Sequence, residues 1–312
     1  MHKRSLHGVI LASALAAMSL PFLGASCDGK KKVETPAVGA GTEAQAKGTA
    51  PPAPSNELPG VDLSSLGSEQ KARLLKLVDK LQSPCGKAHA LKTSLATDPE
   101  CKRSLLAARH LARRAAQDLS EEELEVVYEA RYLRKGGYQF DLKSTPFDGA
   151  PNSPVVLVEF FDYGCPACKQ FSMKLEDLVA ELPSEVVVYY KNFPLSSHPD
   201  SIPAAMAAVS AAKQGKFREM HRKLFSFQTK HSKEDLFRYA KEIGLDQAKF
   251  EADMQDPATR AKVMADREEG LKADLEGTPT LYVSGRKVSE YDMAGTLSDL
   301  VDVVREELAL HR

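Results

Sequence analysis

Apolar residues recur at helical spacing over residues 61–135. The first stripe follows the pattern i, i+3, i+4, i+7 and consists of Leu74, Leu77, Val78 and Leu81. Further along, Ser120 is followed three residues later by Glu123, the signature of a capping box that begins a helix. The sequence therefore predicts a small N-terminal helical region over 61–135. Its core would be small for an independent domain, so we expect it to pack against the chain that follows.

Two runs of β-branched and aromatic residues flank a helical pattern in the second half of the chain. The first run is Val155–Phe161 and the second is Val186–Tyr190. Their nearly continuous apolar character is typical of buried strands. Between them, apolar residues repeat at helical spacing until Pro183 ends the helix. Strand, helix and strand with short connections predict a βαβ unit.

Weaker patterns surround this unit and complete a predicted α/β domain over residues 136–312. In chain order they predict a short strand over Tyr138–Leu142, helices over about 200–273, a hairpin of Thr280–Val283 with Lys287-Val288, and a final helix over 296–310.

The N-terminal residues have the pattern of an export signal. Lys3 and Arg4 precede an uncharged apolar run, and small residues come directly before Cys27. This order predicts a secretory signal peptide over residues 1–26. The residues before Cys27 resemble the bacterial lipobox, in which that cysteine is acylated and becomes the mature N-terminus. Ordinary signal cleavage nearby and an uncleaved anchor are the alternatives.

Residues 27–60 lack aromatic side chains and are rich in Ala, Gly and Pro. Such a segment buries too little apolar surface to offset the entropy lost on ordering it. We therefore expect a disordered tether between the membrane and the folded part of the chain.

The overall composition is that of a folded globular protein, with 43% hydrophobic and 27% charged residues among 312. The 42 basic and 43 acidic residues nearly cancel, and tryptophan is absent. A large basic patch or a set of stacking platforms for nucleic acid is therefore not expected. No uncharged apolar run occurs outside the N-terminus, so the sequence does not predict a multi-span membrane protein.

The chain has 5 cysteines, and export implies a compartment in which disulfides persist. If Cys27 carries a lipid and Cys165 pairs with Cys168, then Cys85 and Cys101 remain as a second pair. Such a bridge closes a loop of about 16 residues and stabilises the fold by roughly 3 kcal/mol. We interpret it as a structural staple; a second redox-active or resolving pair is the alternative.

The motif Cys165-Pro166-Ala167-Cys168 lies where a predicted buried strand gives way to a helix. Unpaired N–H groups and the positive end of the helix dipole would stabilise the Cys165 thiolate. Pro166 suits the first helical turn, and Cys168 follows one turn on, where it can close a disulfide with Cys165. A structural zinc site would need further ligands at suitable spacing, which the sequence lacks. A purely structural bridge across so short a loop gains little stability.

This strand and motif resemble the thioredoxin superfamily, specifically its DsbA-like branch. Three further segments carry the resemblance: Asn192-Phe193-Pro194-Leu195 with His198-Pro199, Gln214-Gly215-Lys216-Phe217 with Met220-His221, and Gly277-Thr278-Pro279-Thr280. The resemblance covers about residues 138–310. It implies a thioredoxin-like fold with a helical insertion.

The resemblance also implies roles for matching residues. Cys165 matches the exposed nucleophilic cysteine, and Cys168 matches the buried resolving cysteine. Glu159 matches a buried acid beneath the resolving cysteine that relays its proton, although a side chain turned to solvent is the alternative. Pro279 matches the proline that is cis in this family, and the backbone of Thr278 would pair with an extended substrate.

One residue departs from the pattern of strongly oxidising members. Ala167 stands where those members often have histidine, which removes a hydrogen-bond donor near Cys165. We therefore expect a milder oxidant. Thr278 also occurs in isomerase-like relatives, which leaves the direction of electron flow open. For His198 and His221 we expect packing or surface roles and no catalysis.

The sequence thus predicts an exported thiol–disulfide oxidoreductase, preferably an oxidase, in the bacterial cell envelope. The expected partners are cysteine-containing exported proteins and a membrane redox protein that resets the active pair. We expect no cofactor, no metal ion and no nucleic acid, and membrane contact through a lipid anchor. A reductase or isomerase, and a peptide-binding module without turnover, are the alternatives.

Overall fold

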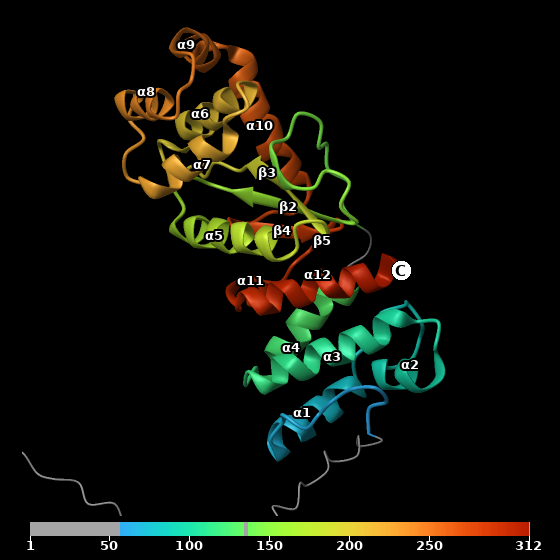
Figure 1. Cartoon of the computed structure of the whole chain (residues 1–312). Coiled ribbons are helices and arrows are strands. Elements are labelled where there is room, and N and C mark those ends of the chain that lie inside the picture. Colours follow the sequence, from blue (N-terminus) through green and yellow to red (C-terminus); the bar gives the residue numbers. More distant parts are fainter. Residues whose placement is uncertain (1–56, 134–136, 312) are drawn as a thin grey trace, which may run out of the picture. The chain divides into compact units, whose positions relative to one another are not determined.

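The computed structural model describes residues 57–133 and 137–311, and the strands within them form one mixed sheet in the order β1-β3-β2-β4-β5 (Figure 1). At its centre, β2 (Val155–Phe161) runs parallel to β3 (Val186–Asn192) and antiparallel to β4 (Thr280–Val283). β1 (Phe147–Gly149) lies antiparallel to β3 at one edge, and β5 (Arg286–Lys287) lies antiparallel to β4 at the other. The predicted α/β fold and its central βαβ unit are confirmed.

The central strand β2 is buried on both faces. Val155, Leu157 and Phe161 belong to one apolar cluster, whereas Val158 and Phe160 belong to a second cluster across the sheet. Because both faces are covered, the strand has almost no polar residue.

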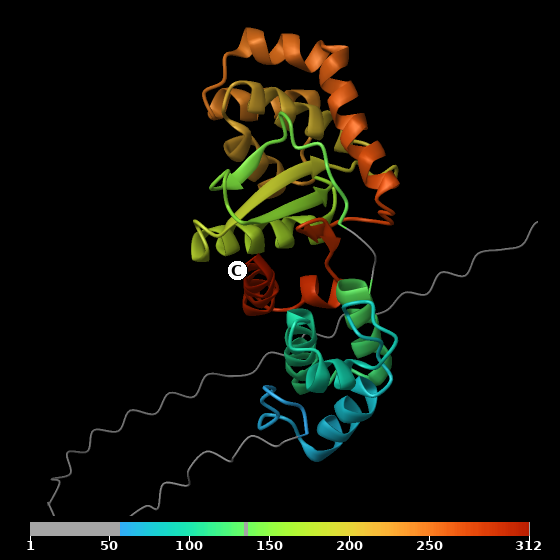
Figure 2. The same ribbon diagram turned by 90° about the vertical axis from the view of Figure 1, so that its right-hand side faces the viewer.

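Helices cover the two faces of this sheet. α5 (Pro166–Glu181) and α12 (Leu297–His311) lie on one face, and α10 (Pro257–Lys272) lies on the other (Figures 1 and 2). In α10, a Cβ added at Gly270 would lie only 2.7 Å from the ring of Phe193, a member of the second cluster. Glycine at this position therefore lets the helix approach the sheet closely.

The described chain between β3 and β4 consists mainly of helices, in the place where the sequence predicts an insertion. These helices are α6 (Ser201–Lys213), α7 (Phe217–Ser226), α8 (Lys233–Glu242), α9 (Gln247–Gln255) and α10. The buried side of α6 is largely alanine, and these small side chains allow close packing against α10.

The N-terminal helical region precedes the sheet. It consists of α1 (Ser68–Val78), α2 (Leu91–Thr97), α3 (Lys102–Ala116), α4 (Glu121–Tyr128) and the π-helix η1 (Glu129–Leu133). The predicted capping box is confirmed, because the hydroxyl of Ser120 accepts from the backbone N–H of Glu123 at 3.2 Å and the Glu123 carboxylate accepts in return at 2.8 Å. The predicted stripe of leucine and valine is buried in the core of this region.

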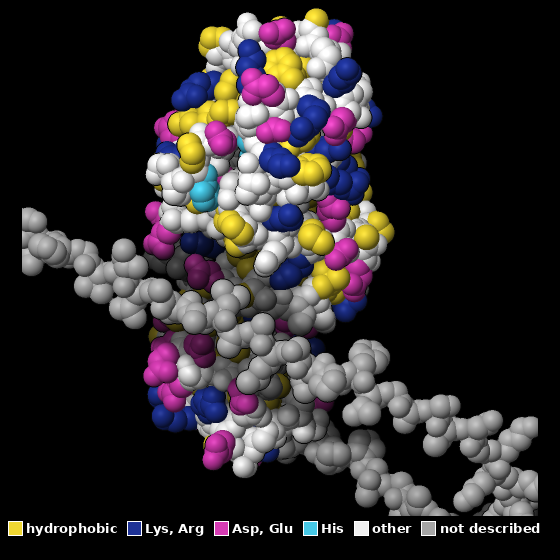
Figure 3. Space-filling model, turned by 90° about the vertical axis from the view of Figure 1, so that its left-hand side faces the viewer, with side chains coloured by type: hydrophobic (Ala, Val, Ile, Leu, Met, Phe, Trp, Pro, Cys, Tyr) yellow, Lys and Arg dark blue, Asp and Glu magenta, His cyan; other side chains and the backbone are white. Residues whose placement is uncertain are grey.

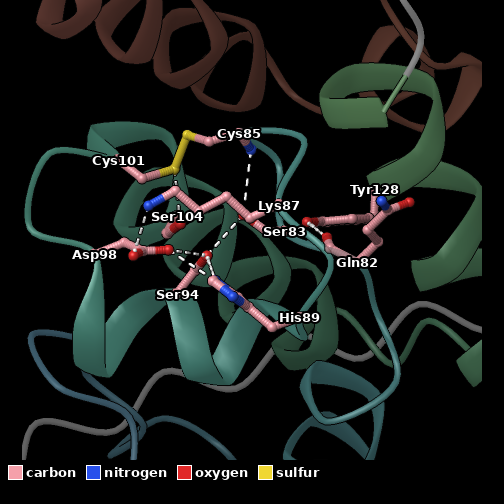
Figure 4. Close-up of a disulfide and its surroundings, with 10 residues drawn as sticks. All are labelled: Gln82, Ser83, Cys85, Lys87, His89, Ser94, Asp98, Cys101, Ser104 and Tyr128. Atoms are coloured by element: carbon pink, nitrogen blue, oxygen red, sulfur yellow. Dashed lines mark hydrogen bonds and ion pairs between the residues drawn. A yellow bond between two sulfur atoms is a disulfide. The ribbon is translucent and has the colours of Figure 1, made fainter.

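A disulfide joins Cys85 to Cys101, the residue that precedes α3, with the two Cα atoms 6.1 Å apart (Figure 4). Polar side chains tie the same loop. Asp98 accepts hydrogen bonds from Lys87 at 2.8 Å and from Ser94 at 3.0 Å (Figure 4). The bridge therefore fastens a loop that hydrogen bonds also hold.

The N-terminal helical region packs against α12, as predicted from its small core. Glu306 of α12 is 7% exposed and pairs with Arg113 of α3 at 2.6 Å and Arg131 of η1 at 2.8 Å. Tyr132 donates a further hydrogen bond to Glu306 at 2.8 Å. Moving the N-terminal helical region along α12 would leave the Glu306 carboxylate buried without partners, which is costly. These contacts therefore fix the register of the region on α12.

The predicted strand over Tyr138–Leu142 is wrong. Its alternating side chains pack on a sheet face instead of entering the ladder: the ring of Phe140 lies 4.9 Å from that of Tyr282 and 5.3 Å from that of Phe160. The edge strand is β1, further along the chain. In the predicted hairpin, β5 begins one residue earlier than expected, at Arg286.

The predicted signal peptide, Cys27 and nearly all of the predicted tether lie outside the described residues. Within residues 57–133 and 137–311, no helix is long and apolar enough to cross a membrane. Basic and acidic side chains are interspersed on the face drawn in Figure 3.

Candidate active site

The motif Cys165-Pro166-Ala167-Cys168 lies at the junction between β2 and α5. Cys165 is the residue before α5, with an extended backbone (φ −83°, ψ 118°), and Pro166 begins the helix. Cys165 is only 7% exposed and is therefore buried, where the family resemblance implies an exposed sulfur. Cys168 is fully buried, and the two cysteines are not joined by a disulfide. The sulfur of Cys165 lies 3.4 Å from the carbonyl oxygen of Thr278, in the loop before β4. The cysteine motif and the Thr278 loop therefore lie next to each other.

The two sulfurs ionise very differently. The Cys168 side chain, the N–H groups of Cys168 and Ala167, and the Thr278 side chain together lower the pKa of Cys165 from 9.0 to about 5, against the opposing effect of burial. Burial, followed by the hydrogen bond with Cys165, raises the pKa of Cys168 far above its ordinary value. At neutral pH, Cys165 is thus a thiolate and Cys168 a thiol.

Glu159 of β2 is fully buried, with 0% exposure, and is not turned to solvent. Neither carboxyl oxygen has a hydrogen-bond partner among the described residues. Burial, with a smaller contribution from the Cys165 thiolate, raises the pKa of Glu159 to about 8. Its charge in turn contributes to the raised pKa of Cys168. A neutral acid in this position can exchange a proton with the departing or returning Cys168 thiolate.

Asp162, which sequence reasoning missed, organises the turn between β2 and α5. Its carboxylate accepts from the N–H of Gly164 at 2.6 Å and from that of Leu195 at 2.7 Å, and it pairs with His198 at 2.9 Å. Ser201, at the start of α6, donates to the same carboxylate. Asp followed two residues later by glycine was a sequence signal for such a turn. The contacts to the insertion carried no local signal.

Gln228 is a second residue that the sequence did not reveal. It lies between α7 and α8, and its side-chain amide donates to the carbonyl oxygens of Tyr163 at 2.9 Å and Cys165 at 2.8 Å. These two hydrogen bonds attach the helical insertion to the backbone of the active-site turn. Because Gln228 is far from the motif in sequence, no spacing pattern pointed to it.

His221 belongs to the packing of the site. Its ring nitrogens lie 2.9 Å from the hydroxyl of Tyr163 and 3.0 Å from that of Ser172. Burial lowers the pKa of His221 to about 3, so the ring is neutral at physiological pH. The expected packing role for His221 agrees with this position, whereas His198 acts on the turn through Asp162.

A groove of about 550 Å³ opens beside the motif. Ala167, Phe171 and Lys174 line it from α5, and Thr278 with Pro279 line it from the loop before β4. The Thr278–Pro279 peptide bond is cis, as the family resemblance implies. Within the residues that the structure describes, no group of three or more His, Cys, Asp or Glu side chains is placed to hold a metal ion.

A comparison with known protein families identifies the family to which the chain belongs. The family model described as Thioredoxin matches residues 141–303, a little over half of the sequence. The chain belongs to the thioredoxin family. In this thioredoxin-family protein, the N-terminal helical region lies before the matched segment.

Among solved structures, the chain is similar to a thioredoxin-like oxidoreductase from Silicibacter pomeroyi, with 31% identity, a TM-score of 0.48, and coverage of 53% of this chain and 93% of that one. It is also similar to the thiol-disulfide exchange protein alpha-DsbA2 from Wolbachia pipientis, with 26% identity, a TM-score of 0.48, and coverage of 54% and 88%.

Curated relatives include Na(+)/H(+) antiporters NhaA 1. The match to the protein from Mycobacterium sp. (strain KMS) has 37% identity over 142 residues, and that from Mycolicibacterium vanbaalenii has 34% over 156 residues. These alignments cover 45% and 49% of this chain but only 23% and 25% of the antiporters. The similarity is therefore to one part of each antiporter.

The arrangement of the site is suited to thiol–disulfide exchange. It provides a stabilised thiolate at a helix N-terminus, a protonated second thiol one turn away, a buried acid and an adjacent groove.

Proposed function

We propose that this thioredoxin-family chain is an exported thiol–disulfide oxidoreductase that works as a DsbA-like oxidase of cysteine-containing proteins. The observation that carries the proposal is the opposite ionisation of its two sulfurs. Cys165 has a pKa lowered to about 5 beside the groove, whereas burial raises the pKa of Cys168. Stabilising one thiolate stabilises the reduced enzyme, and this makes the disulfide form a stronger oxidant.

The size of the pKa shift of Cys165 supports an oxidase of intermediate strength. At neutral pH, a pKa lowered from 9.0 to about 5 stabilises the reduced form by about 3 kcal/mol. This corresponds to roughly 60 mV for a two-electron couple. Ala167 contributes only its N–H to the stabilisation of the Cys165 thiolate. We therefore expect a reduction potential below those of the strongest oxidants of the DsbA-like branch.

In the proposed reaction, the oxidised enzyme begins with a Cys165–Cys168 disulfide. A substrate thiolate attacks the sulfur of Cys165, the bond to Cys168 breaks, and a mixed disulfide forms. The released Cys168 thiolate takes a proton, for which Glu159 is the buried donor. A second substrate thiolate then attacks the substrate sulfur of the mixed disulfide, and Cys165 leaves as a stable thiolate. The substrate has lost two electrons and the enzyme has gained them.

The enzyme needs a partner to complete a cycle. We propose a membrane redox protein that accepts the two electrons and restores the Cys165–Cys168 disulfide. The groove lined by Thr278 and Pro279 is the proposed docking surface for an extended substrate segment, whose backbone would pair with that of Thr278.

We propose further that residues 1–26 direct export, that Cys27 carries the lipid anchor, and that the enzyme works in the bacterial periplasm. The order of basic, apolar and small residues before Cys27 supports this location. Replacing Cys27 with serine should move the protein from the membrane fraction to the soluble fraction of the envelope. An unchanged distribution would contradict the anchor.

Trapping in cells tests the reaction. Cys168→Ser should accumulate mixed disulfides with exported proteins, because the Cys165 thiolate can still attack a disulfide of a substrate protein, whereas the Cys168 thiol that would break the resulting mixed disulfide is gone. Cys165→Ser should form none and should not oxidise dithiols. Normal dithiol oxidation by Cys165→Ser would refute the assignment. The state of the wild-type pair gives the direction: mainly disulfide in cells supports the oxidase, and mainly dithiol supports a reductase or isomerase.

A further inference from the structure

A short helix forms one wall of the groove beside the active site. It is α11 (Glu290–Ala294), which has 5 residues and lies beside α12 (Figure 1). Glu290, Met293 and Ala294 line the groove, whereas Asp292 is fully buried. Because so short a helix has little stability of its own, contacts with other elements must set its position.

The buried side of α11 meets two basic residues of the N-terminal helical region. Arg114 of α3 forms an ion pair with the Asp292 carboxylate at 3.0 Å, and Nε2 of His110 lies 3.2 Å from the same carboxylate. Both basic side chains are only 3% exposed. Burial alone would raise the pKa of Asp292, but His110, with Arg131 and Arg114, reverses the effect and lowers it. Asp292 is therefore a buried carboxylate held by the helical region.

Arg114 also reaches the residues that follow α11. Its second guanidinium nitrogen lies 3.3 Å from Asp299 of α12 and donates to Gln117 at 2.6 Å. A Cβ added at Gly295 would lie 3.2 Å from this nitrogen, which shows how closely the guanidinium packs against the end of the helix.

A lysine of the catalytic helix holds the opposite side of α11. Lys174 of α5 donates to the carbonyl oxygens of Met293 at 2.7 Å and Gly295 at 2.5 Å. The wall is therefore held between α5, which carries the cysteines, and α3, which lies outside the segment matched by the thioredoxin family.

We propose that the N-terminal helical region determines how polypeptide substrates fit the groove, and that Arg114 and His110 are positioning residues that act through Asp292 and α11. The inference rests on the proposed oxidoreductase function. Neither residue touches the cysteines; each fixes a wall against which an extended substrate would lie. A small thiol reagent needs only the sulfur of Cys165, so its reaction does not depend on the wall.

The test compares two substrates in full-length protein. Arg114→Met should lower kcat/KM for oxidation of a short synthetic dithiol peptide by about tenfold, or about 1.4 kcal/mol, mainly through a higher KM. Oxidation of dithiothreitol should stay within about twofold of the wild-type rate. Arg109→Met is the matched control, because Arg109 also lies on α3 but donates to the carbonyl oxygen of Gly60 at 2.9 Å, whereas Arg114 pairs with Asp292. It should leave the ratio of peptide to dithiothreitol rates unchanged.

A second variant guards against loss of folding. Asp292→Asn keeps the side-chain volume and should reproduce the selective loss of peptide oxidation, whereas the Arg114→Met and Asp292→Asn effects together should be less than additive. Equal losses with both substrates, or the same ratio in the Arg114 and Arg109 variants, would overturn the inference while leaving the proposed function standing. A wild-type protein that oxidises neither substrate would overturn the proposed function and the inference with it.

Discussion

Replacing Glu159 with glutamine should make the protein more stable and less active. The carboxyl group is fully buried, and neither of its oxygens has a hydrogen-bond partner among the described residues. Glutamine has nearly the same shape but never ionises, so it removes the cost of placing a titratable acid in this site. The same change removes the carboxyl proton that we propose Glu159 gives to the Cys168 thiolate.

The size of the stability gain follows from the pKa of Glu159, which burial raises from 4.5 to about 8. Below the unfolded-state pKa, the acid is protonated in both states and the substitution should be nearly neutral. At about pH 7 the unfolded chain gains from ionisation and the folded protein does not, which costs the wild type about 3 kcal/mol. The cost approaches about 5 kcal/mol once the pH rises above the folded-state pKa.

Denaturant unfolding of the reduced proteins measures this difference directly. The stability advantage of Glu159→Gln should be near zero at about pH 4 and should grow steadily through about pH 8. Stopped-flow mixing of the oxidised proteins with a thiol should show slower protonation-dependent release of Cys168 in the variant. A stability difference that does not change with pH would refute the reasoning that places Glu159 as a buried neutral acid.

Three further changes test other parts of the site. Alkylation of Cys165 should rise with a midpoint near pH 5 because its thiolate is stabilised, whereas a midpoint near 9 would contradict this. Gln228→Ala removes two hydrogen bonds to the active-site turn and should lower the free energy of unfolding by about 1–3 kcal/mol while raising that alkylation midpoint. Gln247→Ala removes one side-chain hydrogen bond elsewhere in the insertion, so it should cost about half as much stability and leave the midpoint unchanged. Serine at both Cys85 and Cys101 should lower the unfolding free energy by about 3 kcal/mol and leave dithiol oxidation intact, while lost oxidation would give that pair a redox role.

Local patterns in the sequence were sufficient for the elements that carry the cysteines. The apolar run of β2 matches the strand residue for residue, and the position of Pro166 at the start of α5 followed from its chemistry. The segment over Tyr138–Leu142 alternates apolar and polar residues as a strand does, but its aromatic rings pack against one face of the sheet. The spacing of apolar residues indicates which side chains are buried, but it does not indicate whether the backbone pairs with a neighbouring strand.

Contacts between distant segments were beyond the reach of local patterns. Gln228 bonds to Cys165 across 63 residues, and Arg114 pairs with Asp292 from a region that lies outside the family resemblance. Such pairs follow from the packing of helices on the sheet, and neither residue type nor spacing marks them in advance. The cysteine motif could be assigned from sequence, whereas the groups that position it and its groove required the structure.

The equilibrium reduction potential of the Cys165–Cys168 couple, measured against glutathione, tests the central claim most directly. With its thiolate stabilised well beyond that of thioredoxin, we expect a potential at least about 50 mV above the roughly −270 mV of thioredoxin and below the roughly −120 mV of DsbA. A potential at or below about −270 mV would contradict the account, because it would mean that the Cys165 thiolate is stabilised no more than that of thioredoxin.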